Sequence, residues 1–248
     1  ARGLFIDTVN GKVVARSYDK FFNLNERAET KLDMLQFKLK FPVSAYVKEN
    51  GFLGLVSYDE ERDDFFVCSK SSPEGPYAQR MRQIFLDTVK HPEELKQYLK
   101  EQNVTLVFEC IDPVNDPHII KYDFPKVVLL DVIKNQLVYE KLPYSQLCDF
   151  ERYGFEVKRK AAVLNSWSEF YNWYTDVSDE DYLFDGKPIE GFVVEDSSGF
   201  MFKLKLSYYN FWKHMRSVAN SLFRCGYYKY TGSLLTPLAN EFYGILKE

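Results

Sequence analysis

Short apolar runs separated by polar turns recur along this chain, and the most regular pair surrounds Asn50-Gly51. Residues 43–47 and 52–58 are rich in Val, Tyr and Leu, and apolar and polar positions partly alternate, as is typical of strands. The dipeptide between them tolerates the positive φ angles of a tight turn. The pattern therefore predicts a β-hairpin with Lys48 next to its turn.

Two other pairs of runs predict hairpins by the same rule. One hairpin turns at Asn10-Gly11, and the other turns at residues 196–199. In the second arm of the latter hairpin, residues 202–206, apolar positions alternate strictly with Lys203 and Lys205. Both lysines are therefore expected on one face of that strand.

Nearly continuous apolar runs at residues 105–111 and 126–132 predict strands that are buried on both faces, and residues 65–70 predict another strand. Glu109 interrupts the first of these runs. An ionised carboxylate in an apolar strand is unfavourable unless it pairs with a cation or a metal, or faces a polar cleft. Its position alone makes Glu109 a candidate site residue.

Segments whose apolar residues have helical spacing lie between these predicted strands. Residues 77–88 present one apolar face, Pro92 suits the first turn of a helix over residues 93–101, and Ser166 begins a capping box that starts another helix. Strands and helices mixed in this way predict an α+β protein.

The end of the chain is also predicted to be helical. Ser207 can cap a helix that Gly226 would end, and a last helix is predicted to begin at Thr236-Pro237. We therefore expect a main domain over residues 1–206 and a C-terminal helical segment over residues 207–248, which could begin a small further domain.

Composition narrows the function classes. With 248 residues, of which 46% are hydrophobic, the chain can bury a large core, and no apolar run approaches the roughly 18 residues that span a bilayer. A net charge of −4 argues against a globally basic nucleic-acid binder, so any phosphate-binding surface must be local. The four cysteines and three histidines lack metal-ligand spacing, which argues against zinc and disulfides and favours a reducing, cytoplasmic compartment.

Seven short motifs follow one another in an order that is typical of a known family. They are Arg2-Gly3, Lys20-Phe21-Phe22-Asn23, Lys48-Glu49-Asn50-Gly51, Ser69-Lys70, Phe108-Glu109, Glu190-Gly191-Phe192-Val193 and Phe202-Lys203-Leu204-Lys205. The ordered set resembles ATP-dependent RNA ligases of the covalent lysine nucleotidyltransferase superfamily, from Arg2 to about Lys205. Within it, the chain is similar to the T-even bacteriophage tRNA-repair type and to the adenylyltransferase domain of fungal tRNA ligases. Asn50, where most members carry Asp, resembles the fungal group.

The resemblance implies an α+β nucleotidyltransferase fold, an ATP-grasp-like ligase adenylation domain with antiparallel sheets, flanking helices and ATP between the sheets. It implies that Lys48 becomes a lysyl-adenylate, that AMP passes to a 5′-phosphate RNA end, and that a 3′-hydroxyl then seals the strands. The implied cofactors are ATP and Mg²⁺ or Mn²⁺. The implied partner is RNA, with tRNA halves as the favoured substrate; no membrane is involved, and a monomer is favoured.

The same resemblance implies the site residues. Lys48 is the nucleophile, and because an amine attacks only when neutral, the cations Arg2, Lys203 and Lys205 are expected to lower its pKa. Glu109 and Glu190 are candidate metal ligands. The expected ATP-binding residues are Arg2, Lys20, Lys48, Glu49, Gly51, Lys70, Glu109, Leu130, Glu190, Val193, Lys203 and Lys205, with Leu130 and Val193 on either side of adenine.

Two other interpretations stay open. A DNA ligase or an mRNA-capping guanylyltransferase would share the lysine nucleophile, although the segment 20–23 argues against both. A catalytically silent nucleotide- or RNA-binding module would share the fold, although intact Lys48, Glu109, Lys203 and Lys205 argue against it. Because the family usually recognises RNA through an appended domain, this chain is expected to adenylate itself more readily than it seals RNA.

Overall fold

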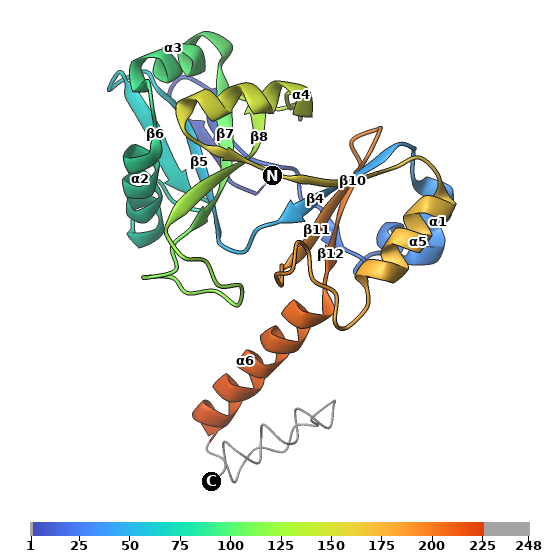
Figure 1. Ribbon diagram of the computed structural model, residues 1–248. Coiled ribbons are helices and arrows are strands. Elements are labelled where there is room, and N and C mark those ends of the chain that lie inside the picture. Colours follow the sequence, from blue (N-terminus) through green and yellow to red (C-terminus); the bar gives the residue numbers. More distant parts are fainter. Residues whose placement is uncertain (1, 226–248) are drawn as a thin grey trace.

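The computed structural model describes residues 2–225 and contains two five-stranded sheets that face each other (Figure 1). The first sheet has the order β10 (Lys160–Leu164), β4 (Val43–Lys48), β11 (Gly191–Asp196), β12 (Met201–Lys205) and β3 (Phe22–Asn23). The second has the order β6 (Asp64–Ser69), β5 (Phe52–Asp59), β7 (Val104–Ile111), β8 (Lys126–Lys134) and β9 (Glu156–Val157). Neighbouring strands are antiparallel except for the short pairs β12–β3 and β8–β9. The predicted α+β class with antiparallel sheets is confirmed.

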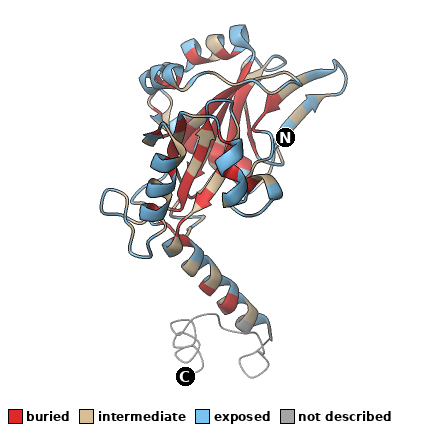
Figure 2. Cartoon of the chain, turned by 90° about the vertical axis from the view of Figure 1, so that its right-hand side faces the viewer, coloured by how far each residue is buried: buried red, intermediate tan, exposed pale blue. Residues whose placement is uncertain are grey.

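Helices cover the outer face of each sheet, where the apolar stripes predicted from the sequence are buried (Figure 2). The first sheet packs against α1 (Leu32–Lys38) and α5 (Trp167–Val177). The second packs against α2 (Pro76–Thr88), α3 (Pro92–Gln102), α4 (Tyr144–Leu147) and the 3₁₀ segment η2 (Cys148–Tyr153). A shorter 3₁₀ segment, η1 (Ala28–Thr30), precedes α1. A third apolar cluster, which includes Leu55, Val107 and Met201, joins the two sheets.

The hairpin predicted around Asn50-Gly51 is wrong, although both of its strands exist. β4 pairs with β10 and β11 in the first sheet, whereas β5 pairs with β6 and β7 in the second. Residues 49–51 are therefore a link between the two sheets. Asn50 is buried in this link instead of lying at an exposed turn, because its backbone and side chain are bonded to groups from distant segments.

The other two hairpins are confirmed. β1 (Leu4–Asp7) pairs with β2 (Lys12–Arg16), and Gly11 in their connection has a φ of +65°. β11 pairs with β12, and Gly199 in that turn has a φ of +85°. Glycine suits both positions because other residues rarely adopt a positive φ.

Helix boundaries follow the expected signals with one difference. The Ser166 hydroxyl caps α5 by accepting a hydrogen bond from the Glu169 N–H at 3.2 Å. α6 (Ser207–Cys225) begins at Ser207 itself, whose hydroxyl donates to the Ser178 carbonyl at 3.4 Å instead of capping the helix. The predicted stop at Gly226 and the helix at Thr236 lie outside the described residues. Among the described residues, no helix is both long and apolar enough to cross a bilayer.

A buried polar cluster ties the two sheets together. Asp131 of β8 is fully buried and accepts from Tyr18 at 2.6 Å and from the buried Lys158 at 2.8 Å. Lys141 lies 3.3 Å from Asp131 and 2.7 Å from Glu195 of β11, so it bridges carboxylates of opposite sheets. A buried charge is tolerated when it is paired and hydrogen-bonded, as here.

Asp131→Asn is expected to lower the free energy of unfolding by about 3 kcal/mol, because it leaves the buried Lys158 ammonium without its carboxylate. Urea unfolding measures this change. The matched control is Asp185→Asn, which breaks an exposed pair with Arg159 and should cost less than about 1 kcal/mol. Equal losses for the two variants would contradict the role of Asp131.

Candidate active site

A cavity of about 970 Å³ lies between the two sheets. The structure places all of the sequence-predicted ATP-binding residues on its wall, although they come from separate segments of the chain. They are Arg2, Lys20, Lys48, Glu49, Gly51, Lys70, Glu109, Leu130, Glu190, Val193, Lys203 and Lys205. The prediction that these residues gather at one place is therefore confirmed, while their individual roles stay predictions.

Three neighbouring strands bring Lys48, Glu190 and Lys205 together. Gly191 of β11 lies opposite Lys48 of β4 on one side and opposite Lys205 of β12 on the other. The Glu190 carboxylate, one residue before Gly191, lies 2.9 Å from the Lys48 Nζ and 3.1 Å from the Lys205 Nζ. Glu190 therefore holds both ammonium groups, and Lys48 is left only 19% exposed.

The link after Lys48 is held by hydrogen bonds from both sheets. The Asn50 Nδ2 donates to Glu190 at 2.8 Å, and its Oδ1 accepts from the Ile120 N–H at 3.2 Å. The Gly51 N–H donates to Glu109 of β7 at 2.8 Å. The expectation that Glu109 faces a polar cleft is confirmed, because it lines the cavity from inside an apolar strand.

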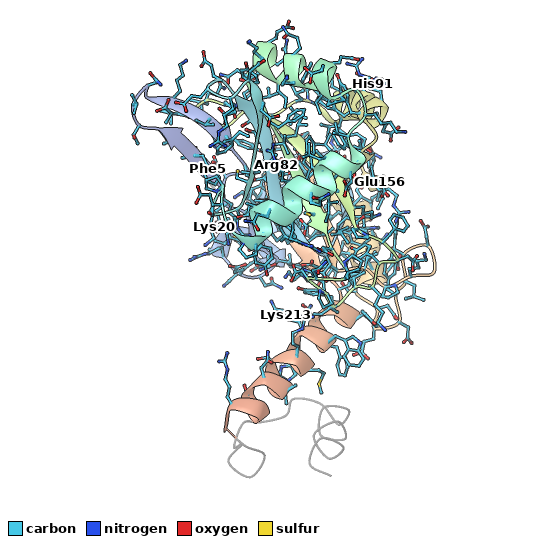
Figure 3. The ribbon with its side chains drawn as sticks, turned by 90° about the vertical axis from the view of Figure 1, so that its left-hand side faces the viewer. Phe5, Lys20, Arg82, His91, Glu156 and Lys213 are labelled. Carbon is cyan, nitrogen blue, oxygen red and sulfur yellow. The ribbon has the colours of Figure 1, made fainter. Side chains whose placement is uncertain are left out.

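The cavity wall is positively charged although the chain as a whole is negative. Seven Lys and Arg residues line it against four Glu residues, which gives a net formal charge of +3, while the chain carries −4. Lys20, which follows β2 and is labelled in Figure 3, belongs to this set. This wall is a local concentration of positive charge, which any phosphate-binding surface on a chain of net negative charge would need.

Two buried lysines of the cavity wall have pKa values below the ordinary value. Burial, together with Arg2, Lys48 and Lys205, lowers the pKa of Lys203 to about 8. Burial also lowers the pKa of Lys205, against the opposing effect of Glu190. Buried cations that destabilise one another are typical of a site that binds an anion.

The predicted lowering of the Lys48 pKa is wrong for the protein without ligand. Burial would lower the pKa, but the carboxylates of Glu109 and Glu190 outweigh this effect and hold the pKa of Lys48 above its ordinary value. The sequence prediction counted the neighbouring cations and did not place the two carboxylates on either side of the amine.

An apolar slot lies beside these charges. Leu130 of β8 and Val193 of β11 come from opposite sheets, line the cavity and pack against the apolar cluster that joins the sheets. Two apolar walls from facing sheets can hold a planar base by stacking and dispersion.

Two residues at the site were not predicted from the sequence. Tyr122 supports the link from outside the cavity wall: its hydroxyl accepts from the Asn50 N–H at 2.9 Å and donates to Glu49 at 2.8 Å. It lies in a loop without periodicity, so no pattern pointed to it. Tyr209 lies in the first turn of the helix that follows β12 and lines the cavity, with the Lys205 Nζ 4.8 Å from its ring centre. Lys205 belongs to the strand and Tyr209 to the helix, so no periodicity in the sequence connects the two.

Comparison with known proteins identifies the family. A family model described as RNA ligase matches residues 1–209. The chain belongs to the RNA ligase family. It is 28% identical to a tRNA ligase of Candida albicans and 26% identical to tRNA ligase 1 of Schizosaccharomyces pombe, each over 90% of this chain. The alignments cover 31% and 32% of those proteins, so this RNA ligase chain spans about a third of their length.

Solved structures show the same fold at low sequence identity. An archaeal ATP-dependent RNA ligase has a TM-score of 0.58 at 14% identity, over 95% of this chain and 58% of that one. A Naegleria gruberi RNA ligase with PPi has a TM-score of 0.60 at 16% identity, over 86% of this chain and 60% of that one. The predicted ligase-type fold of this family member is confirmed.

Proposed function

We propose that this chain is the catalytic domain of an ATP-dependent RNA ligase that forms a covalent adenylate on Lys48. The observation that carries the proposal is the placement of one buried amine, held by Glu190, between an apolar slot and a wall of net charge +3. An adenine base fits the slot between Leu130 and Val193, and a triphosphate fits the cationic wall.

The residues divide into two groups by what they would contact. Lys203, Lys205 and Arg2 would hold the phosphates, as would Lys20 and Lys70 farther along the wall. The Lys48 Nζ attacks the α-phosphorus once it is neutral, so an N–P bond forms as the bond to pyrophosphate breaks. The cationic wall stabilises the charge that accumulates on the departing pyrophosphate.

The acidic residues fit a divalent cation only in part. Among residues 2–225 no three His, Cys, Asp or Glu side chains gather as a metal site, but Mg²⁺ needs only one or two carboxylates when phosphates supply other ligands. Glu109 fits this role better than Glu190, because both Glu190 oxygens are already paired with lysines. Such a cation would neutralise phosphate charge, and a Naegleria gruberi RNA ligase mutant of similar fold is described with ATP and Mn.

The RNA steps follow from the family. AMP on Lys48 would pass to the 5′-phosphate of an RNA end, and a 3′-hydroxyl would attack that activated phosphate and release AMP. Two relatives are named tRNA ligases, which favours tRNA halves as the substrate. The buried Asn50 amide adds to this inference, since the resemblance places Asn at this position in the fungal group.

A pulse and chase experiment tests the proposal. The protein is labelled with α-³²P-ATP and Mg²⁺, freed of nucleotide, and then given RNA with a 5′-phosphate and a 3′-hydroxyl. We expect label on the protein first, then on RNA, then free AMP with sealed product. Label from GTP and not ATP would indicate a capping enzyme, and transfer to DNA alone would indicate a DNA ligase. A folded protein that binds ATP without labelling would be a silent binding module.

The lowered pKa of Lys203 gives ATP binding a pH dependence. With a pKa of about 8, this amine is mostly protonated at pH 7 and mostly neutral at pH 9 in the free protein. Only the protonated form attracts a triphosphate, so the affinity for ATP should fall about tenfold over this range. Lys203→Arg stays charged and should flatten the profile. The measurement is the Kd by calorimetry of an ATP analogue with a non-cleavable α,β-methylene bridge, so that Lys48, which contributes to the low pKa of Lys203, stays in place. If the wild-type and Lys203→Arg proteins lose affinity equally between pH 7 and pH 9, the assignment is wrong.

A further inference from the structure

α6 leaves the body of the domain at the cavity. It follows β12 directly, Tyr209 in its first turn lines the cavity, and the rest of the helix extends away from both sheets (Figure 1). The helix has 19 residues, so at about 1.5 Å per residue it is about 28 Å long. Whatever binds along α6 therefore has one end at the site of Lys48 and Lys205.

One face of α6 carries a stripe of positive charge. Lys213, Arg216 and Arg224 are exposed and continue the line of Tyr209 at intervals of three, four or eight residues, which places them on one side of a helix. We call these three residues the basic stripe. No Asp or Glu occurs anywhere in α6, and within residues 2–225 none of the three residues forms an ion pair. Phe211, Met215 and Val218 occupy the other side of the helix and are partly or fully buried.

Two cations of the basic stripe lie close enough to the cavity to act on charged and polar groups of its wall. Lys213 contributes to the lowered pKa of Lys205, and Arg216 acts on the Tyr209 hydroxyl, so both cations lie near groups of the cavity wall. Lys213 is labelled in Figure 3 on the part of α6 that adjoins the body. The positive charge of the wall thus extends outward along the helix on a chain whose net charge is −4.

Exposed aromatic rings accompany the stripe. Tyr208 is 37% exposed and Trp212 is 42% exposed, and their ring centres lie 6.4 Å apart on a neighbouring side of α6. Alternating cations and aromatic rings are the usual means of binding a single nucleic-acid strand, because phosphates pair with the cations and bases stack on the rings.

We propose that the basic stripe of α6 binds the phosphodiester backbone of the RNA strand whose end enters the cavity. This inference rests on the proposed function and adds the surface that holds the substrate outside the cavity. Binding through phosphates is independent of base sequence, so the stripe guides an RNA end to Lys48 without selecting its sequence.

The test removes the stripe and measures RNA binding directly. Lys213→Ala, Arg216→Ala and Arg224→Ala are combined in the 248-residue chain, and the probe is a fluorescent single-stranded RNA with a 5′-phosphate. We expect binding to weaken at least about tenfold, and the slope of log K against log[salt] to decrease by about 2, because three phosphate contacts are lost. Transfer of AMP from Lys48 to the RNA should slow with it, while labelling of Lys48 by ATP should persist.

Two controls separate charge from structure. Lys31→Ala, Lys38→Ala and Lys40→Ala remove three exposed lysines around α1, which lies far from α6 in Figure 1, and should leave binding and salt slope unchanged. Lys213→Arg, Arg216→Lys and Arg224→Lys keep the charges and should retain RNA binding. If this charge-conserving variant loses binding, a structural effect of the helix explains the loss and the proposal is wrong.

The remaining outcomes are also decisive. Unchanged RNA binding and an unchanged salt slope in the alanine variant would overturn the proposal. A change of oligomeric state without a change in RNA binding would also overturn it, because the stripe would then bind a protein partner. Failure of the wild-type chain to label with ATP would refute the proposed function separately, because RNA binding is measured without ATP.

Discussion

Lys48→Ala is expected to reduce labelling by α-³²P-ATP to less than about one thousandth of the wild-type rate, since the amine that would form the N–P bond is absent. Lys48→Arg should be equally inactive, because a guanidinium stays protonated and cannot attack phosphorus. Labelling followed by denaturing electrophoresis measures both variants. ATP should still bind each protein, because the apolar slot and the other six cations of the wall remain.

The matched control for Lys48 is Lys40→Ala, an exposed lysine outside the cavity, which should label at the wild-type rate. Residual labelling of Lys48→Ala at a comparable rate would show that another residue carries AMP. Mapping the labelled peptide of the wild-type protein would then identify that residue. In that event the Glu190 ion pair with Lys48 would be structural only.

Gly51→Ala is expected to slow labelling at least about 100-fold and to destabilise the fold by about 2 kcal/mol. A Cβ at this position would lie 2.1 Å from the Cys110 carbonyl oxygen in β7, so the link must move away from the second sheet. That movement breaks the hydrogen bond to Glu109 and displaces Lys48, and errors of about 1 Å in a reacting group cost about 100-fold in rate. Labelling rate and urea unfolding measure the two effects.

Gly11→Ala is the control for this substitution. Nothing lies within 4 Å of a Cβ at Gly11, and only its φ of +65° opposes alanine, at a cost of about 1 kcal/mol. Its labelling rate should match the wild type. A Gly51→Ala variant that labels normally would mean that the link tolerates displacement, and the geometry of the site would then depend on β4 alone.

The sequence predicted the long strands and two of three hairpins, but it missed the short strands β3, β9 and β10 and the partners of β4. Alternation and β-branched residues identify a strand such as 43–48, but its pairing with the next strand was inferred only from the local signals, the Asn50-Gly51 dipeptide between two apolar runs. What decides the pairing of β4 is burial against α1 and α5, which involves residues far away in the chain. For β11 and β12, where the turn and both strands are local, the same reasoning was correct.

For the candidate site, too, the sequence identified residues but not the contacts that folding creates between them. The ordered motifs supplied predicted site residues that all lie on the cavity wall, and Glu109 also stood out as a charge in an apolar strand. Tyr122 was missed because a loop residue gains its contacts only from the folded chain. The direction of the Lys48 pKa was wrong for the same reason, because it depends on which charges surround the amine and not on which occur in its motifs.

The strand order also fixes when the site can form during folding. β4 carries Lys48, and its two neighbours in the sheet are β10 and β11, so Lys48 itself lies opposite Gly191. Pairings this distant in sequence form slowly, because a long loop must close before any contact stabilises it. During synthesis the strand that carries the nucleophile therefore stays without its sheet partners until most of the chain has emerged, and no fragment that ends before β11 can assemble the cavity.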